Sequence, residues 1–552
     1  MTSQGSHFTI WLDRGKRSVA GLRGAALILV ALAALISLHT SGVGWLLLLR
    51  VVVMLSLSTL AGAALITRLQ TQFPDATLFW LTAYLIGICL LSLSGFVLAQ
   101  NWLFNNVPLA SAPGRLWIGG GAIALLALVG LAQWALAARA NRSSFELGPF
   151  LILMSAAIIF NAVVHRGFYD FLPTNPSQIS DHVTHVITFT DQLLQSGMPQ
   201  PVFVHTGLQT LLIQMEGYIG SLDSWDRASG YKILSLGAFF VAAYGGYGLG
   251  RYGWGLVRPL AVLAGVSTLA FCAIAPTPWI LPASGYLGFY SPAATFYHNA
   301  TQLFSHGLAV IGLLLMALAW RRRVPLFAVG GPLLGFSLYF KPTFLYTLAP
   351  ALLVMFLLQL RWLSRDEMLG YAAVAGAFLL WFLYPALTQT SVLTSGGFEL
   401  RLFDWPLRYI PANYPLPAFL QPVFAPAIAI VFSFAFPLAV LAVQLADHPP
   451  QCRSWIEALC RRWSDYRFEV LLVLFCVVGL GAATLLAERT LPTDGNQIWG
   501  LASGYLVLLP LFILLASRIR NNLARWLVWA IFALHILSGA LQIYRWLALG
   551  RL

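Results

Sequence analysis

The sequence predicts an all-α polytopic membrane protein with about fifteen transmembrane helices. The chain has 552 residues, of which 59% are hydrophobic and 9% are charged, and its mean hydropathy is +0.78. A soluble globular domain does not have this balance. Apolar stretches of about 20 residues, the length that crosses a bilayer as a helix, follow one another along most of the chain.

Each of these stretches is interpreted as one helix, and Pro, Gly or charged residues separate successive stretches. The approximate cores of the predicted spans are 22–39, 44–66, 77–98, 115–138, 147–164, 231–250, 257–275, 301–320, 324–340, 343–360, 369–390, 420–445, 468–487, 498–517 and 525–545.

The distribution of basic residues predicts the orientation. If successive spans alternate in direction, 21 of the 32 Lys and Arg residues lie on the side of the N-terminus. Cytoplasmic loops collect Lys and Arg, so the N-terminus is predicted to be cytoplasmic. The same rule explains the formal net charge of +13, and no nucleic-acid partner is expected. We predict an integral protein of a bacterial inner membrane, surrounded by membrane lipids.

The predicted loops divide the chain into two parts. Residues 1–146 form a predicted N-terminal bundle of four helices, whose loops contain few acidic residues. Residues 147–552 form a module with three long outer segments, 165–230, 276–300 and 391–419. Because loops carry function, elaboration on one face favours a site on that face. The alternative, that these segments only cover the bundle, stays open.

The first outer segment of the module concentrates acidic residues and contains a predicted amphipathic helix. Six of the 19 acidic residues of the chain lie within residues 165–232. An apolar stripe of the predicted helix 180–195 comprises Val183, Val186, Ile187, Thr190, Leu193 and Leu194. A polar row on the opposite face comprises Asp181, His185, Thr188 and Gln192. We expect this helix to lie on the membrane surface, with its polar row toward water.

Asp181 is the first candidate for a catalytic residue. It follows Ser180, a suitable N-cap, so it lies in the first turn, where the helix dipole favours an anion. Such a carboxylate can remove a proton from a sugar hydroxyl or hold a metal ion. His185 shares its face, and Asp170 is the second acidic candidate. Solvated carboxylates without any function are the competing interpretation.

The histidines near Asp181 raise the question of a metal. His182, His185 and His205 fit one helix face only loosely, and no HExxH signature is present, so no zinc site is predicted. A divalent cation such as Mg²⁺ or Mn²⁺, bridging Asp181 and a phosphate, remains a weaker alternative.

Lys341 is the most informative basic residue. It interrupts the apolar run LGFSLYFKPTFLYTLAP at the predicted outer end of the ninth span. A Lys at that depth either extends its amine to the interface or binds an anion such as a lipid phosphate. Arg408, His298, Asn299 and His205 lie in predicted outer segments and are further candidates for substrate binding.

These features resemble those of the GT-C superfamily of integral membrane glycosyltransferases, which use polyprenyl-phosphate sugars. The resemblance covers about residues 147–500 and rests on the acidic amphipathic segment ISDHVTHVITFTDQLLQSGMPQP, on YHNAT before a span and on FKPTF at the outer end of another. In that family an Asp of the first extracytoplasmic loop is the catalytic base or a metal-site residue; here Asp181 matches best and Asp170 second. The chain departs from the pattern in its four preceding spans and in the lack of an adjacent acidic pair within residues 165–232.

The resemblance implies an inverting transfer of a hexose or pentose from a polyprenyl-phosphate donor to a glycan, lipid or protein acceptor on the extracytoplasmic face. It implies that Asp181 deprotonates the acceptor and that Lys341, with Arg408, stabilises the departing phosphate. Three alternatives stay open: a polymerase or ligase of lipid-linked glycans, a transporter or flippase of a polar lipid, and a non-enzymatic scaffold. No internal repeat is visible, which weakens the transporter alternative.

Overall fold

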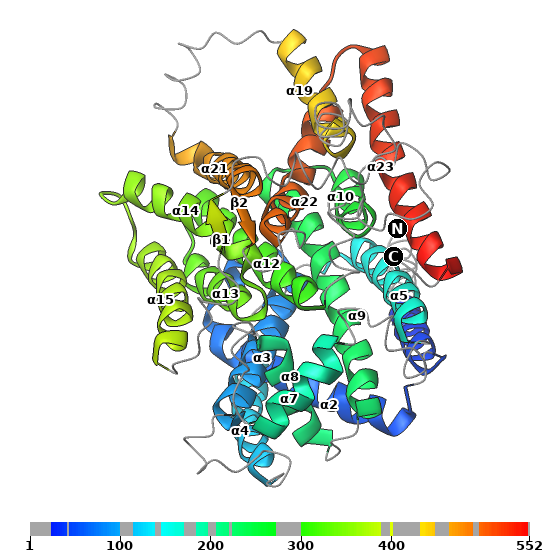
Figure 1. Ribbon diagram of the computed structural model, residues 1–552, viewed down its shortest axis with the longest axis vertical. Coiled ribbons are helices and arrows are strands. Elements are labelled where there is room, and N and C mark those ends of the chain that lie inside the picture. The colour runs from blue at the N-terminus through cyan, green and yellow to red at the C-terminus, as the bar shows by residue number, and fades with distance from the viewer. Residues whose placement is uncertain are drawn as a thin grey trace, which may run out of the picture.

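The computed structural model of the chain is almost entirely helical (Figure 1). It describes residues 24–40, 43–99, 114–137, 145–169, 184–196, 206–219, 224–271, 300–387, 398–400, 431–447, 463–488 and 496–549.

After an unlabelled first helix, Gly24–Thr40, the elements of the first half are α2 (Trp45–Ile66), the 3₁₀ turn η1 (Thr67–Gln72), α3 (Ala76–Ala99), α4 (Gly114–Ala137), α5 (Leu147–Tyr169), the π-helical turn η5 (Thr184–Thr188), α7 (Phe189–Ser196), α8 (Gly207–Ile219), α9 (Ser224–Gly248), the π-helical turn η6 (Leu249–Gly253) and α10 (Arg258–Ala270). Those of the second half are α12 (Ala300–Arg322), α13 (Phe327–Phe340), α14 (Pro342–Gln359), α15 (Arg365–Leu387), β1 (Phe398–Leu400), α19 (Ala435–Asp447), α21 (Trp463–Leu485), β2 (Leu486–Glu488), α22 (Asn496–Ser517) and α23 (Asn522–Leu549).

The predicted helical class is confirmed, whereas the predicted number of spans is not. The described part of each of the fifteen apolar cores lies largely in a helix. Among the described residues, however, six helices are long and apolar enough to cross a membrane: Trp45–Gln72, Ala76–Val97, Leu147–His165, Asp226–Gly253, Ala300–Arg322 and Asn522–Leu541. Several others are shorter. The 14 residues of α13 extend about 21 Å, less than the roughly 30 Å of a hydrocarbon core.

Large apolar side chains remain exposed around the helices. Leu380 of α15 is 69% exposed, and Leu523 and Trp526 of α23 are 71% and 72% exposed. A soluble monomer rarely exposes so many large apolar side chains, whereas lipid tails cover them without cost. Together with the six long apolar helices, this surface fits an integral membrane protein.

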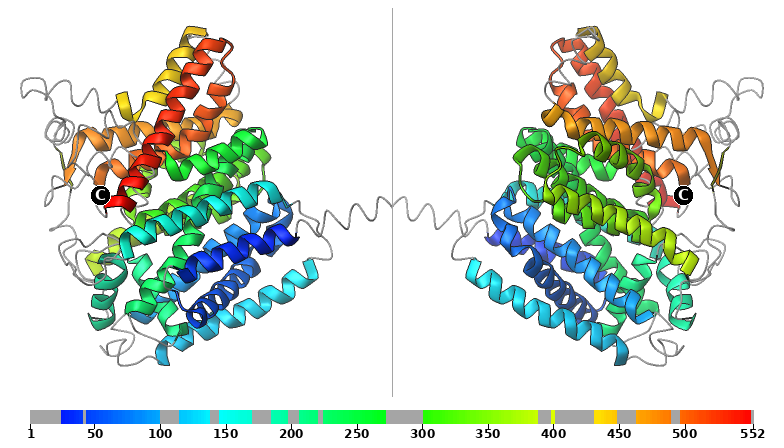
Figure 2. Two further views of the ribbon diagram at one scale, coloured as in Figure 1. Left: turned by 90° about the vertical axis from the view of Figure 1, so that its right-hand side faces the viewer. Right: turned by 90° about the vertical axis from the view of Figure 1, so that its left-hand side faces the viewer.

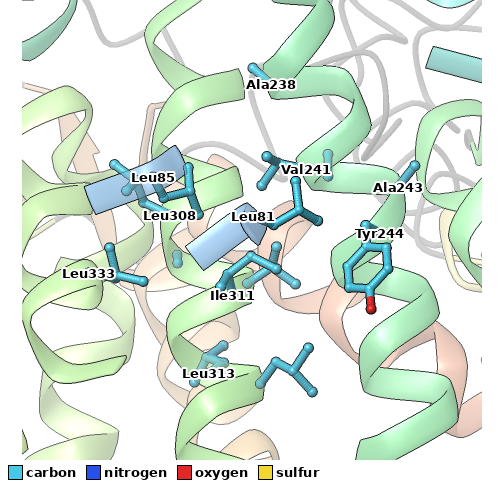
Figure 3. Close-up of a cluster of buried hydrophobic side chains, with 14 of the residues drawn as sticks. Leu81, Leu85, Ala238, Val241, Ala243, Tyr244, Leu308, Ile311, Leu313 and Leu333 are labelled. Atoms are coloured by element: carbon cyan, nitrogen blue, oxygen red, sulfur yellow. The ribbon is translucent and has the colours of Figure 1, made fainter. Parts of the chain in front are cut away.

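Two helices form the centre of the molecule. Every residue of α12 from Ala300 to Trp320 is buried, and nearly all of α9 is buried as well. Around them, α3, α9, α12 and α13 contribute side chains to one hydrophobic cluster, in which Leu85, Val241 and Leu308 lie near one another (Figure 3). This cluster holds α9 and α12 together, and the polar side chains lie near the helix ends.

The N-terminal helices share this core. Gly62 of α2 and Gly87 of α3 allow a close approach of the two backbones, because a Cβ at either position would overlap a carbonyl oxygen of the other helix. Helix α3 also packs against α8, which belongs to the module predicted for residues 147–552. Along the long axis, α4 lies at one end and α19 at the other (Figure 2). The boundary at residue 146 stays a prediction.

The helix ends form two polar regions. We call the region that contains Asp75, Glu146, Glu367 and Arg467 the inner end, and the region that contains Glu216, Arg227 and Lys341 the outer end.

Contacts between distant helices agree with the predicted alternation of direction. The rings of Trp254, after α9, and Phe468, in the second turn of α21, are 5.6 Å apart, and both residues belong to the side predicted to be cytoplasmic. Strand β1, in the outer segment 391–419, pairs antiparallel with β2, at the predicted outer end of the span 468–487, with Glu399 opposite Ala487. Which end faces the cytoplasm stays a prediction.

The structure corrects the interpretation of residues 180–195 as a helix on the membrane surface. The predicted apolar stripe is buried at Val186, Thr190, Leu193 and Leu194. It is covered by protein, however, because η5 and α7 pack against α8, and η5 also contacts α9 and α12. These helices offer the apolar stripe a closer packing partner than lipid.

The predicted helix is also not a continuous α-helix. Residues Thr184–Thr188 form the π-helical turn η5, and α7 begins only at Phe189. A π turn contains about one extra residue, so residues at its start are rotated by up to about 100° relative to the α-helical positions expected from the sequence. The predicted alignment of His185 with Gln192 is therefore wrong, whereas that of Asp181, which lies outside the described residues, stays a prediction.

Candidate functional site

Most predicted site residues lie outside the residues that the structure describes. These are Asp170, Asp181, His205, His298, Asn299 and Arg408. Of the other two, His185 has its backbone in η5, and Lys341 is described with its side chain. The prediction that Asp181, Lys341 and Arg408 border one cavity therefore stays a prediction.

Lys341 lies at a fixed break between α13 and α14. Its backbone is extended, as expected for a residue before proline, and Pro342 begins the next helix. Its amide donates to the Ser337 carbonyl oxygen at 3.0 Å, and its own carbonyl oxygen accepts the Ser305 hydroxyl at 2.9 Å. The residue is only 6% exposed. A side chain enclosed by protein favours the anion-binding interpretation over extension to the interface.

Buried polar side chains gather around this break. We call the group of Thr301, Gln302, Ser305, His306, Ser337, Lys341 and Thr347 the outer polar cluster; all of these residues are buried. The Ser305 hydroxyl donates to both Ser337 and Lys341 carbonyl oxygens, and the His306 ring meets Phe344 edge-on at 6.1 Å. Four members lie in the first two turns of α12.

The sequence contains a signal for this cluster. Thr301 and Ser305, and likewise Gln302 and His306, are four residues apart and therefore lie above one another on α12. Repeated polar side chains at this spacing in an otherwise apolar span indicate a polar contact with a neighbouring helix.

A chain of hydroxyl groups attaches α8 next to Lys341. The Ser92 hydroxyl donates to the Gly207 carbonyl oxygen at 2.7 Å and lies 3.0 Å from the Thr210 hydroxyl. The Thr210 hydroxyl lies 3.1 Å from the hydroxyl of Tyr339, two residues before Lys341. These contacts join α3, α8 and α13, so α8 is held firmly against the outer end.

A buried ion cluster joins α7, α8 and α9. The Arg227 Nε atom contacts Glu216 Oε1, and its Nη1 atom donates to Asp191 Oδ1 at 2.8 Å. The Arg227 and Glu216 side chains are fully buried, whereas Asp191 is 44% exposed. Glu216 lies outside the candidate membrane spans. Burial raises its pKa to about 7, although the Arg227 charge opposes that shift.

A second polar contact ties α5 to α9 at the same end. The His165 Nε2 atom lies 2.6 Å from the Ser235 hydroxyl, which donates to the Asn161 side-chain oxygen at 2.8 Å. The Asn161 amide in turn donates to the Lys232 carbonyl oxygen at 3.2 Å. Asn161 bonds Ser235 rather than His165, so the group lacks the order of a catalytic triad and acts as a link between helices.

The described part of the chain contains no group of three His, Cys, Asp or Glu side chains that could hold a metal ion. The ligands proposed from the sequence for a divalent cation, Asp181 and its neighbours, lie outside this part, so the cation stays a prediction.

Taken together, the fold and the outer end define a polytopic helical membrane protein with polar and cationic side chains buried at one end of its helices. Comparisons with models of protein families, with curated proteins and with solved structures found no match.

Proposed function

We propose that the protein is an integral membrane glycosyltransferase that transfers a sugar from a polyprenyl-phosphate donor to an acceptor on the extracytoplasmic face. The observation that carries this proposal is the buried Lys341, held in a rigid break beside the outer polar cluster. A cation fixed at the end of a membrane bundle suits the phosphate of a lipid whose tail lies in the bilayer.

The proposed reaction is a single displacement at the anomeric carbon. The acceptor hydroxyl oxygen forms the new bond to this carbon, and the bond from the carbon to the phosphate oxygen breaks. The proton of the hydroxyl passes to the carboxylate of Asp181, and polyprenyl phosphate leaves with the electron pair. Lys341, with Arg408, stabilises the charge on the departing phosphate. Attack opposite the leaving group inverts the configuration of the sugar.

The position of the buried charges favours an enzyme over a transporter. Within the described residues, the buried Asp, Glu, Lys and Arg side chains are Asp75, Glu216, Arg227, Lys232, Lys341 and Glu367. They gather near the two ends of the bundle. A path for a polar headgroup requires such side chains along the middle of the membrane, so a flippase is the weaker candidate.

The test is a transfer assay with the purified protein in nanodiscs. Labelled polyprenyl-phosphate hexoses and pentoses are offered with a panel of glycan, lipid and peptide acceptors. Transfer of label to an acceptor supports the proposal. Movement of the labelled lipid across a vesicle membrane without transfer would instead support the flippase alternative.

Two substitutions connect any transfer to the proposed residues. Asp181→Asn removes the base, and Lys341→Met removes the buried charge; each should lower kcat/KM by about 100-fold or more. Lys341→Arg should retain part of the activity. Lys232→Met is the matched control, because Lys232 is similarly buried, at 8% against 6% exposure, and has no role in the proposed reaction. Wild-type activity in both Asp181→Asn and Lys341→Met would refute the mechanism.

A further inference from the structure

The guanidinium of Arg227 bridges the junction between η5 and α7. Its Nη1 atom donates to the Ile187 carbonyl oxygen at 3.3 Å, inside the π turn, and to Asp191 Oδ1 at 2.8 Å, in the first turn of α7. Its Nε atom contacts Glu216 of α8. One side chain from the first turn of α9 thus holds both sides of the junction and a third helix.

The burial of these groups makes the bridge rigid. The Arg227 side chain is 0% exposed, as is that of Glu216. A guanidinium presents its donors in a planar fork, so a contact at Nε fixes the direction in which Nη1 points. Lys cannot reproduce this arrangement, because its ammonium group is a single point charge on a flexible stem.

The π turn determines how the chain before α7 is directed. If η5 relaxed to an α-helix, the residues at its start would rotate by up to about 100° relative to α7. His185 belongs to η5, and the sequence-predicted base Asp181 precedes it. Keeping the π turn intact therefore matters for any chemistry that this segment performs.

We propose that Arg227 is a positioning residue that maintains the π turn and thereby directs the segment containing His185 toward the outer end. The catalytic part of this inference rests on the proposed function. Its structural part, the control of the junction by Arg227, can be measured without any enzyme assay.

The first measurement is a distance between two spin labels. In a chain whose five cysteines are replaced, labels are attached at Thr188→Cys in η5 and at Val97→Cys in α3; both native side chains are exposed. The wild type should give a narrow distance distribution in nanodiscs. Arg227→Gln should broaden it roughly twofold, and Arg227→Lys should broaden it less.

Asp191→Ala provides a second, milder variant in case Arg227→Gln does not fold. It removes one contact of Arg227 at a half-exposed position and leaves the buried contact with Glu216. It too should broaden the distribution. Arg321→Gln, which removes an ion pair at the inner end, is the matched control and should not. Unchanged distributions in Asp191→Ala and in every folded Arg227 variant would overturn the inference.

The second measurement concerns catalysis. In an active preparation, Arg227→Gln should lower kcat by roughly 100-fold, because misplacement by about 1 Å has such an effect, while KM for the lipid donor changes less than about twofold. Arg227→Lys should recover part of kcat. Equal kcat in wild type and Arg227→Gln would overturn the catalytic meaning. If the wild type transfers no sugar, the proposed function fails, and the label distances alone decide the control of the junction.

Discussion

The two ends of the bundle bury opposite charges. At the inner end the buried charged side chains are the carboxylates Asp75 and Glu367, whereas at the outer end Arg227, Lys232 and Lys341 are buried against one fully buried carboxylate, Glu216. The inner end therefore has an excess of buried acid and the outer end an excess of buried base within the described residues.

The inner carboxylates close the fold. Asp75 caps α3, because its carboxylate accepts a hydrogen bond from the Leu78 amide at 2.7 Å. It also accepts hydrogen bonds from the hydroxyls of Tyr244 in α9 and Tyr252 in η6. Glu367 forms a capping box with Ser364 and accepts from Arg467 at 3.0 Å. Each of these two carboxylates thus caps its own helix and also accepts hydrogen bonds from a distant element.

The outer cations are arranged differently. Lys341 lies in a helix break, among hydroxyl and imidazole side chains that suit a polar ligand. The comparison teaches that similar burial can serve two purposes: stability at the inner end and, in our proposal, recognition of an anion at the outer end. Substitutions at the inner end should therefore affect mainly unfolding, and those in the outer polar cluster mainly activity.

The largest effect on stability is expected for Asp75→Ala. The substitution removes the cap of α3 and leaves the hydroxyls of the buried Tyr244 and the half-buried Tyr252 without their acceptor, so the free energy of unfolding should fall by about 3 to 5 kcal/mol. SDS-induced unfolding in mixed micelles measures it. Asp75→Asn, which keeps one acceptor oxygen, should lose about half as much. Asp366→Ala, at a half-buried acid in the first turn of α15, is the control; an equal loss there would contradict this interpretation.

Arg467→Gln should have the next largest effect. Arg467 contacts Glu367, donates to the Trp320 carbonyl oxygen at 3.4 Å and lies over the Trp320 ring at 5.2 Å. Its loss should cost about 2 to 3 kcal/mol of unfolding free energy without changing sugar transfer. Arg321→Gln, at a more exposed ion pair, should cost less than about 1 kcal/mol. A transfer defect in folded Arg467→Gln would break the division between the two ends.

Glu216 should make stability depend on pH. Burial raises its pKa in the folded protein from 4.5 to about 7, so between these values the folded state binds more protons than the unfolded state. Its contribution is therefore present below pH 4.5 and is lost as the pH rises through 7, by on the order of 3 kcal/mol. The free energy of unfolding, measured across this range, should fall with rising pH. Glu216→Gln should remove this slope, whereas Glu469→Gln, a control at the inner end, should retain it. An unchanged slope in Glu216→Gln would contradict the assignment.

The sequence predicted the helices well because its apolar stretches are long and separate. It did not predict which helices are long enough to span, since that depends on where tertiary contacts end each helix. It indicated Lys341, because a charge in an apolar run is conspicuous. It did not predict the contact of Arg227 with Asp191 and Glu216, which requires knowing that α7, α8 and α9 meet. The π turn at Thr184–Thr188 has no sequence signature that we recognise. Asp75, just after Pro74, was recognisable as a helix cap and was overlooked.

The smallest effect on stability, and the sharpest test of the comparison, is expected for Ser305→Ala. Its hydroxyl connects α12 to the Ser337 and Lys341 carbonyl oxygens at 3.0 and 2.9 Å. Hydrogen bonds between membrane helices contribute on average about 0.6 kcal/mol, so unfolding should change by less than about 1 kcal/mol. The break at Lys341 should nevertheless loosen, and KM for the lipid donor should rise about threefold, the equivalent of roughly 0.6 kcal/mol.

Ser337→Ala is the matched control for this substitution. The Ser337 hydroxyl donates to the Leu334 carbonyl oxygen within its own helix, so its removal leaves the Ser305 contacts with α13 and Lys341 in place. The two variants lose the same chemical group at the same helix crossing and should unfold alike, but only Ser305→Ala should weaken donor binding. Equal KM values in the two variants would show that the hydroxyl contact at Lys341 serves stability alone, as the contacts of the inner end do.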